Sequence, residues 1–308
     1  MNKKVQVLLS SYNGEKYIVK QIESILNQEN VDVHILIRDD GSTDNTVNLI
    51  NNVKKKYPLA VDLIKGNNLG YKKSFLELCH RTNIDYDYYA FSDQDDYWLP
   101  NKLEEAIQYL SKSDKKIKLY ASTVSITNEN LKFLYKKDIS NFINTFGSSL
   151  TRIRLAGCTY VFNLEALALL RKYNFNNVSN EHMISHDGLL MILCQALDGY
   201  VYVDRDSYIL HRRRQDSVTS GGNGLVKRLK IEKDITFGHR NKQYCLLVYI
   251  KKHYGKMLSN NNMDLINSIL EYSDMPTKKF KLLFDKRLNC GIHLANLENK
   301  IRILVNRF

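Results

Sequence analysis

Three aspartates crowd one short stretch of the chain, FSDQDDYWLP at residues 91–100. Asp93, Asp95 and Asp96 repel one another unless a cation or a positively charged ligand lies among them. Carboxylate oxygens favour Mg²⁺ or Mn²⁺, and Mg²⁺ fills its remaining positions with water and substrate phosphates. The stretch therefore indicates a site for a phosphorylated small molecule. A structural interpretation stays open, in which Asp96 or a neighbour caps the helix that starts near Leu99.

A second acidic turn, RDDGSTDNT, follows an apolar run earlier in the chain. Asp39 or Asp40 could accept hydrogen bonds from a ribose or a base, as a carboxylate at this place does in dinucleotide-binding folds. Gly41 also suits an Asx turn, with Ser42 or Asp44 capping the next helix. Both interpretations can hold for different residues of the turn.

No glycine-rich phosphate loop follows the first predicted strand, which ends in SSYNGEKY. Without GxGxxG or GxxxxGK[ST], backbone cradling of a diphosphate is not predicted. A metal held by Asp95 would take over that task. Lys73, in GYKKSF, could add positive charge, although it also suits a solvated helix face.

Four strand–helix units within the first 111 residues must position these side chains. They span roughly residues 4–28, 31–57, 60–82 and 86–111. Such alternation predicts an α/β fold with a mostly parallel central sheet and helices on both faces. Right-handed crossovers bring the carboxyl ends of the strands to one edge, where the polar turns meet. Later, KIKLYASTVSIT, GCTYVFN and YVYVDRDSYILHRR are predicted as strands, and LEALALLRKY and DGLLMILCQAL as helices.

Positive charge is concentrated at the end of the chain. Of the net charge of +12, residues 226–308 carry +10, from 17 Lys+Arg against 7 Asp+Glu. From Leu225 onward the pattern predicts helices with apolar stripes and lysine-rich faces, which suit an anionic membrane surface. No nucleic-acid-binding motif is recognisable, so no nucleic acid partner is expected. We divide the chain into a sheet domain, 1–222, and a basic amphipathic helical region, 223–308.

Nothing in the sequence predicts export or a membrane span. The longest apolar run, Tyr244–Ile250, is far below the roughly 18 residues that span a bilayer. The five cysteines form no CxxC pair, which favours a reducing compartment. We expect a cytoplasmic protein that is soluble or peripheral on the inner face of the cell membrane.

Seven segments, in order, resemble one known family. The chain is similar to the inverting nucleotide-sugar glycosyltransferases of family 2, which have the GT-A fold, and especially to bacterial rhamnosyltransferase-like members that build surface polysaccharides. The resemblance covers about residues 4–222. The segments are LLSSYNGEKYIVKQIESILNQ, IRDDGSTDNT, NNLGYKKSF, FSDQDDYWLPNKLE, GCTYVFN, SHDGLL and LHRRRQDSVTSG.

The resemblance implies a role for individual residues. It assigns the metal, Mn²⁺ or Mg²⁺, to Asp95, and the general base to Asp187 in SHDGLL. Such a base takes the proton from the acceptor hydroxyl that attacks the anomeric carbon. From its spacing alone, Asp187 would instead cap the helix that follows. The resemblance assigns nucleotide-sugar contacts to Ser11, Tyr12, Asn13, Glu15, Asp40 and Asp93.

Two departures from the family pattern concern the acceptor and the diphosphate. Gly188 stands where an aromatic residue usually follows the His-Asp pair, which leaves room at the expected acceptor wall. HRRRQ stands where YRQHG is frequent, so Arg214 replaces a histidine, and arginine cannot ligate a cation. We expect Arg214, with Arg212 or Arg213, to pair with the diphosphate. His211 could still reach the metal, and a basic surface loop is the alternative for the arginines.

The expected activity is metal-dependent, inverting transfer of rhamnose or a hexose to a glycan acceptor on a lipid carrier. The implied donors are dTDP-rhamnose or a UDP-hexose. The metal would stabilise the charge that develops on the departing nucleoside diphosphate. One alternative is a basic module that binds membrane surfaces or nucleic acid without transferase activity. A nicotinamide oxidoreductase ranks last, because it would need the glycine-rich loop that this sequence lacks.

Overall fold

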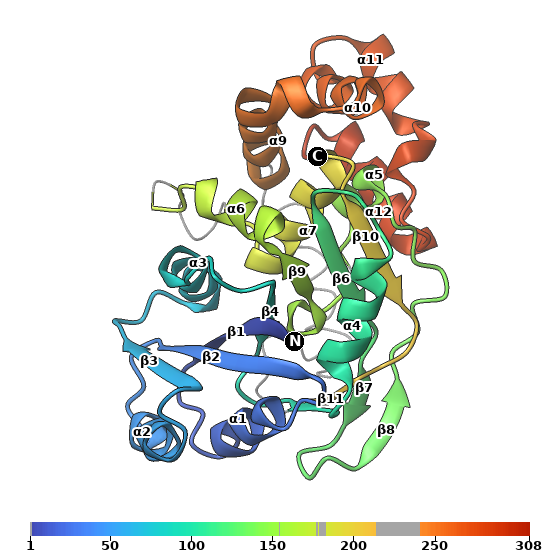
Figure 1. Cartoon of the computed structure of the whole chain (residues 1–308). Helices are drawn as coiled ribbons and strands as arrows, with labels where there is room; N and C mark the ends of the chain where they lie inside the picture. The colour runs from blue at the N-terminus through green and yellow to red at the C-terminus, as the bar shows by residue number, and fades with distance from the viewer. Residues whose placement is uncertain (1, 154, 177, 179–182, 214–240) are drawn as a thin grey trace.

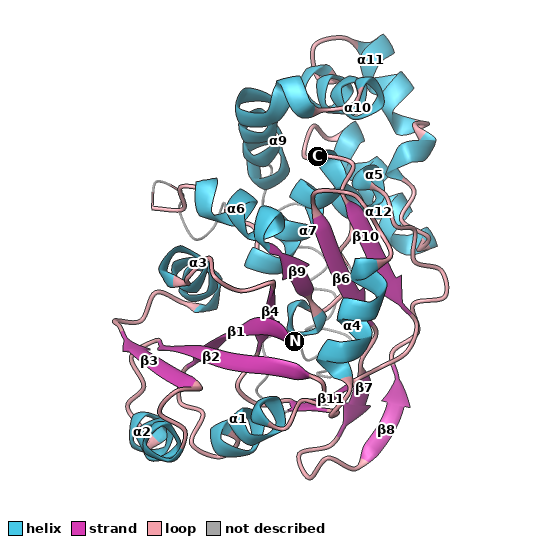
Figure 2. Ribbon diagram, viewed as in Figure 1, coloured by secondary structure: helices cyan, strands magenta, loops and turns pink. Residues whose placement is uncertain are grey.

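The computed structural model describes residues 2–153, 155–176, 178, 183–213 and 241–308, which form two sheets with surrounding helices (Figures 1 and 2). In the main sheet the strand order is β10-β6-β9-β4-β1-β2-β3. Only β9 runs antiparallel to its neighbours. The predicted mostly parallel α/β sheet is confirmed. Its strands are β1 (Lys3–Ser11), β2 (Val31–Asp39), β3 (Val61–Lys65), β4 (Tyr88–Ser92), β6 (Lys118–Ser122), β9 (Val161–Asn163) and β10 (Tyr200–Asp204).

Helices cover both faces of this sheet because its strands are apolar on both sides. On β1, Val7 and Leu9 point into one core and Leu8 into the other, as the alternation of side chains along a strand requires. The first core contains α1 (Ile18–Leu26), α2 (Thr46–Lys56) and α4 (Lys102–Ser111). The second core contains α3 (Tyr71–Arg81), α5 (Phe146–Thr151), α6 (Leu164–Lys172) and α7 (His186–Ala196).

The polar turns leave the sheet at one edge, as predicted. Ser11 at the end of β1 lies opposite Asp39 at the end of β2, and Leu9 lies opposite Ser92 at the end of β4. The loops after β1, β2 and β4 therefore start side by side.

A second sheet holds the DQDD stretch against a distant part of the chain. Its order is β5 (Tyr97–Trp98), β11 (Ile209–Arg212), β7 (Ser125–Thr127) and β8 (Phe133–Lys136). The prediction of one strand across YVYVDRDSYILHRR is wrong, because Asp204 accepts a hydrogen bond from the N–H of Asp206 at 2.9 Å and turns the chain. β10 and β11 are therefore in different sheets.

The end of the chain is helical, as predicted, and packs on the sheet domain. Phe162, Leu193, Ile266 and Ile303 belong to one continuous apolar cluster that joins β9, α7, α10 and α12. The predicted boundary at 222/223 lies outside the described residues. No described helix has both the length and the apolar character that a bilayer span requires. The elements are η1 (Gly157–Thr159), α9 (Asn241–Tyr254), η2 (Gly255–Met257), α10 (Asn260–Glu271), α11 (Pro276–Leu283), η3 (Lys286–Leu288) and α12 (His293–Leu304).

Candidate active site

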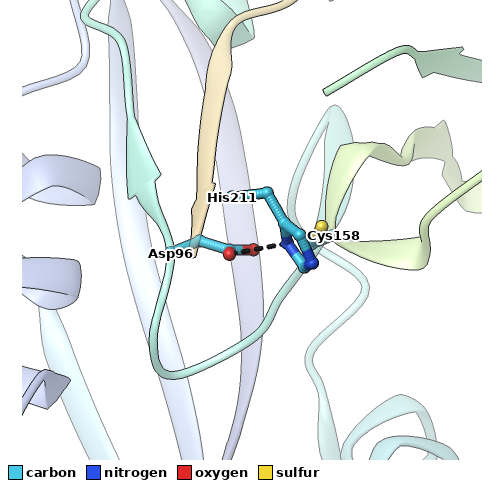
Figure 3. A group of neighbouring side chains, drawn as sticks. All are labelled: Asp96, Cys158 and His211. Carbon is cyan, nitrogen blue, oxygen red and sulfur yellow. Dashed lines mark ion pairs between the residues drawn. The ribbon is translucent and has the colours of Figure 1, made fainter. Parts of the chain in front are cut away.

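The DQDD loop faces a histidine from the second sheet. β5 pairs with β11 so that Tyr97 lies opposite Leu210, which sets Asp96 beside His211. Nδ1 of His211 is 2.8 Å from Oδ1 of the fully buried Asp96 (Figure 3). Cys158 in η1 completes a group whose possible ligand atoms all lie within 4.8 Å of one another.

Asp96 is not a helix cap. The helix that follows, α4, begins at Lys102, and its N-cap residue Asn101 makes no side-chain capping bond. Asp96 instead forms the buried ion pair with His211. The structural interpretation of this aspartate is therefore wrong.

The loop holds more negative charge than its surroundings neutralise. Burial, then the charges of Asp96 and Asp95, raises the pKa of Asp93 to about 8. Asp96, against the effect of burial, raises the pKa of His211 to about 9, with smaller contributions from Asp93 and Asp95. At pH 7 these pKa values leave Asp93 mostly protonated and His211 mostly charged, so a cation that binds among these side chains would replace both protons.

The donor groups fit Mn²⁺ or Mg²⁺. The carboxylates of Asp93, Asp95 and Asp96 are hard oxygen ligands, and the imidazole of His211 suits Mn²⁺. Burial, followed by the charges of Asp96 and Asp93, raises the pKa of the Cys158 thiol well above its usual range, so this group stays a protonated, poor ligand.

Asp95 and Asp96 differ in how they act on His211. The charge of Asp95 helps to raise the pKa of His211, whereas Asp96 contacts the imidazole directly. The assignment of the metal to Asp95 stays a prediction.

Asp187 approaches the same loop from the start of α7. It is the second residue of that helix, and its Oδ1 accepts a hydrogen bond from the N–H of Gly188 at 2.8 Å. Its charge contributes to the raised pKa of Asp93. Burial, then Asp187 and Asp93, also raises the pKa of Tyr71, so this half-exposed ring lies near both carboxylates. A carboxylate separate from the DQDD loop thus faces the same site.

The first turn is tied to the second by the side chains predicted to contact nucleotide. The buried Ser11 hydroxyl donates to Asp39 at 3.0 Å. Asn13 Oδ1 accepts from the N–H of Thr43, and the Glu15 carboxylate accepts from the N–H of Asn45, both at 2.9 Å. The structure thus brings the two turns together, with these polar groups engaged by protein partners.

Asp40 is also engaged inside the protein. It forms an ion pair with the buried Arg38. Its two oxygens accept the N–H groups of Leu69 at 2.8 Å and Gly70 at 2.9 Å, which fixes the loop before α3. Contact between Asp40 and a nucleotide base stays a prediction.

Of the other residues predicted to contact the nucleotide-sugar, two have side chains that are free to meet a ligand, and a third lies outside the described residues. The Tyr12 side chain is 45% exposed beside the DQDD loop. Lys73, in the first turn of α3, forms no ion pair with any described residue. Arg214 lies outside the described residues, so its predicted contact with diphosphate is not located. Arg213, the last described residue of the basic run, donates its backbone N–H to Thr127 at 2.9 Å.

Comparison with known proteins decides the family. The sequence profile of glycosyl transferase family 2 matches residues 6–178, which is more than half of the chain. The chain belongs to glycosyl transferase family 2.

Individual relatives of this glycosyltransferase agree with the family and with its fold. The dTDP-rhamnosyl transferase RfbG of Shigella flexneri is 29% identical over 248 residues, 74% of this chain and 82% of that protein. The crystal structure of S. aureus TarS in complex with UDP-GlcNAc matches 97% of this chain and 81% of its own at a TM-score of 0.59 and 17% identity. The mannosyltransferase PcManGT from Pyrobaculum calidifontis, in complex with GDP-Man and Mn²⁺, matches 97% of this chain and 88% of its own at a TM-score of 0.50 and 13% identity. The rhamnosyltransferase-like resemblance and the GT-A fold are confirmed.

The expected space beside Gly188 is absent from the glycosyltransferase. A Cβ at this position would lie 2.9 Å from Cδ1 of Ile153 and 3.1 Å from Cγ2 of Ile184. These aliphatic side chains fill the volume where room for an acceptor was predicted. The prediction of open space at Gly188 is wrong, since the glycine admits close packing of α7 instead.

Gly157 supports the position of Asp187. A Cβ at Gly157 would lie 2.7 Å from Cβ of Asp187, closer than side chains approach. We expect Gly157→Ala to lower kcat roughly 100-fold, because a displacement of about 1 Å misaligns a reacting group. Steady-state kinetics measures this loss. Gly255→Ala is the control, since its Cβ would meet only Cε of Met263 at 3.4 Å; equal kcat in both variants would contradict the role of Gly157.

His186 should make the folded chain sensitive to acid. It stacks on Phe75 at 3.9 Å between ring centroids and meets the edge of Phe91 at 4.6 Å. Burial lowers its pKa from 6.5 to about 4, so between these pH values the unfolded chain binds a proton that the folded chain does not. The free energy of unfolding should therefore fall by about 2 kcal/mol from pH 7 to pH 5 through this residue.

Urea unfolding of the wild type and of His186→Phe at both pH values isolates this contribution. The phenylalanine keeps the ring stack and removes the titrating group. We expect the variant to lose about 2 kcal/mol less than the wild type between pH 7 and pH 5. An identical loss in both proteins would show that His186 does not titrate in this way.

Several residues of the site were not predicted from the sequence. Gln94 donates to the carbonyl of Tyr12 at 2.9 Å and accepts its N–H at 2.8 Å, which joins the first turn to the DQDD loop. Arg212 was predicted only as a possible partner of the diphosphate; it is buried, donates to the carbonyl of Glu129 at 2.6 Å and lies over the ring of Tyr17. Lys102 is buried with Nζ 3.7 Å from the ring centroid of Trp98. No sequence signal distinguishes these contacts, since each depends on a distant segment.

Proposed function

We propose that this family 2 glycosyltransferase is a metal-dependent, inverting enzyme that moves a sugar from a nucleoside diphosphate to a glycan hydroxyl. One observation carries the proposal. The carboxylate cluster around Asp96 and His211 and the separate carboxylate of Asp187 come from different elements and face one site. A cation-binding group and an isolated base are the two parts that such a transfer needs.

The protein side chains divide the reaction between them. Asp187 accepts the proton of the acceptor hydroxyl as its oxygen attacks the anomeric carbon opposite the leaving group, so one attack inverts that carbon. Tyr71, which lies near Asp93 and Asp187, offers an exposed ring to the sugar, and Tyr12 offers one to the base. Asp95, Asp96 and His211 would hold the Mn²⁺ or Mg²⁺, and Asp93 would contact the nucleotide-sugar. When bound, the metal supplies positive charge for the departing diphosphate.

The donor, acceptor and location follow from the relatives and the charge distribution. The printed name of RfbG supports dTDP-rhamnose as the first candidate donor, and the UDP-GlcNAc complex of TarS supports a UDP-hexose as the second. Arg214 pairs with the diphosphate in this proposal. The acceptor is a glycan on a lipid carrier, in cell-surface polysaccharide synthesis. The enzyme works in the cytoplasm, on the inner face of the membrane.

A thermal-shift panel tests the donor and the metal together. Purified protein is heated with dTDP-rhamnose, UDP-glucose, UDP-GlcNAc or GDP-mannose, with Mn²⁺ or with a chelator. A ligand that binds only the folded chain raises Tm, and a concentration about 100 times Kd adds roughly 2.7 kcal/mol. We expect the largest shift with dTDP-rhamnose and Mn²⁺. Shifts that are equal with chelator would contradict metal dependence, and no shift with any nucleotide-sugar would contradict the proposed donor class.

A further inference from the structure

Helices α11 and α12 lie side by side, and large apolar side chains of this region are exposed. Nζ of Lys279 donates to the carbonyl of Leu304 at 3.4 Å, so the start of α11 lies beside the end of α12. The rings of Phe280 and Phe284 are 4.9 Å apart. A groove of about 460 Å³ separates the two helices, with Phe284 and Leu297 among the residues that line it. The α11–α12 face is the set Phe280, Phe284, Leu297, Ile301 and Leu304, whose side chains are 38 to 65% exposed.

Helix α12 packs on the protein through one stripe and leaves a second, apolar stripe exposed. The stripe toward the body contains the apolar Ala295 and Ile303, together with Asn299, which donates to Thr151 at 3.3 Å, and Arg302, which donates to Gln243 at 3.0 Å. The exposed stripe contains Leu297, Ile301 and Leu304, spaced four and three residues apart on one side of the helix. An amphipathic helix of a globular domain usually buries its apolar stripe. This arrangement indicates that an apolar medium or partner covers the outer side.

The segment that forms the α11–α12 face is positively charged overall, since residues 271–308 hold 8 Lys+Arg against 4 Asp+Glu, a net charge of +4. Every acidic residue from 271 onward forms an ion pair with a neighbouring cation; these are Glu271, Asp274, Asp285 and Glu298. Lys281, Lys286 and Lys300 are exposed and pair with no acidic group of the described chain. Nζ of Lys300 lies 5.5 Å from the ring centroid of Phe284, at the edge of the apolar surface. Apolar side chains flanked by unpaired lysines match an anionic lipid surface.

We propose that the α11–α12 face docks on an anionic lipid bilayer, with the two helices lying in the plane of the membrane interface. Phe280 and Phe284 enter the acyl boundary, while Lys281 and Lys300 stay at the headgroups. A symmetric dimer through the same face is disfavoured, because it would bring the unpaired lysines of two copies together. The inference rests on the proposed function only in one respect: docking would give the enzyme access to a lipid-linked acceptor.

A short chain of contacts joins the docking face to the proposed base. On α12, Glu298 forms an ion pair with Arg152 at 2.7 Å, at the end of α5. The next residue, Ile153, packs on Gly188 in the first turn of α7, beside Asp187. In Figure 1, α5, α7 and α12 gather on the same side of the molecule. The bilayer surface would thus hold the helix that carries Asp187 at a fixed position relative to the headgroups.

Co-sedimentation of the full chain with vesicles tests the docking without any donor. The vesicles contain phosphatidylcholine alone, or phosphatidylcholine and phosphatidylglycerol at roughly 2:1. We expect binding to the anionic vesicles, at least tenfold weaker binding for Phe280→Ser/Phe284→Ser, and little binding to the neutral ones. Leu59→Ser/Ile84→Ser is the matched control, because both side chains are exposed outside the face; its binding should equal that of the wild type.

A second pair of variants separates charge from apolar contact. Lys281→Glu/Lys300→Glu should weaken binding to the anionic vesicles at least tenfold, whereas Lys20→Glu/Lys55→Glu, with the same change in net charge, should not. No vesicle binding by the wild type, or binding unaffected by the face variants, would overturn the inference. A dimer in light scattering that only the face variants disperse would assign the face to a second copy and overturn it too.

The same variants distinguish this inference from the proposed function. A tenfold loss of vesicle binding with an unchanged donor-induced shift in Tm supports docking independently of catalysis. Transfer to a water-soluble acceptor without vesicle binding would leave the transferase standing and remove the docking site. Vesicle binding without any donor binding would support the docking site and contradict the proposed transferase.

Discussion

Asp187→Asn should lower kcat about 1,000-fold while donor affinity changes less than about twofold. A positioned general base typically contributes between 10² and 10⁴ to a rate, and asparagine cannot accept the proton. The variant should fold, because an asparagine oxygen can still accept the N–H of Gly188 that the Asp187 carboxylate accepts at 2.8 Å. Kinetics of transfer, together with donor binding by calorimetry, gives both quantities.

Asp206→Asn is the matched control for this loss. The Asp206 carboxylate is 75% exposed and pairs with Lys136 at the surface, so its removal should leave kcat and donor affinity unchanged. A kcat within tenfold of the wild type in Asp187→Asn would remove Asp187 as the base. A parallel loss of donor binding would instead assign it to the donor site.

Asp96→Asn should abolish metal-dependent transfer more completely than Asp95→Asn. The Asp96 carboxylate is the one in direct contact with His211, and the amide keeps its size without its charge. We expect at least a 100-fold loss of kcat for Asp96→Asn, not restored by more Mn²⁺, and a smaller loss for Asp95→Asn that excess Mn²⁺ offsets. Transfer rates across a Mn²⁺ titration, with Mn²⁺ affinity by calorimetry, compare the two variants.

A double-mutant cycle protects this comparison against misfolding. Removing one partner of a buried ion pair costs about 3–5 kcal/mol because the other stays buried and unpaired. Asp96→Asn/His211→Gln should recover part of that stability in urea unfolding yet bind no more Mn²⁺ than Asp96→Asn. Full Mn²⁺ affinity in Asp96→Asn, with loss confined to Asp95→Asn, would contradict this expectation and support the predicted assignment of the metal to Asp95.

The parallel strands of the main sheet were predictable, because the spacing of apolar residues within each strand–helix unit determines them. The unit from β1 to α1 shows apolar alternation followed by helical spacing, and its turn residues mark the break between them. Ser11 and Asp39 fall at the ends of adjacent parallel strands, so their meeting follows from right-handed crossovers alone.

The choice between Asp95 and Asp96 was not predictable in this way. Neighbouring residues of a loop point in different directions, and the pairing of β5 with β11, more than 100 residues later, decides which one meets His211. Similarly, the filling of the space at Gly188 depends on Ile153 and Ile184, which no local pattern connects to it.

The outward apolar stripe of α12 was also hidden in the sequence. Helical spacing identifies Leu297, Ile301 and Leu304 as one stripe, and such a stripe ordinarily predicts a core contact. The structure shows instead that a different stripe, with Ala295, Asn299, Arg302 and Ile303, faces the body. Tertiary contacts, which the sequence pattern does not show, therefore decide which side of this helix is buried.

Metal-dependent inverting transfer determines the anomeric configuration of the product, which can be measured. The purified chain is incubated with dTDP-rhamnose, Mn²⁺ and a glycan acceptor, and the new glycosidic bond is examined by NMR while dTDP release is followed. We expect a product whose anomeric configuration is opposite to that of the donor, formed with Mn²⁺ and not with chelator or with Asp187→Asn. A product that retains the donor configuration, or one formed equally well with chelator, would contradict it.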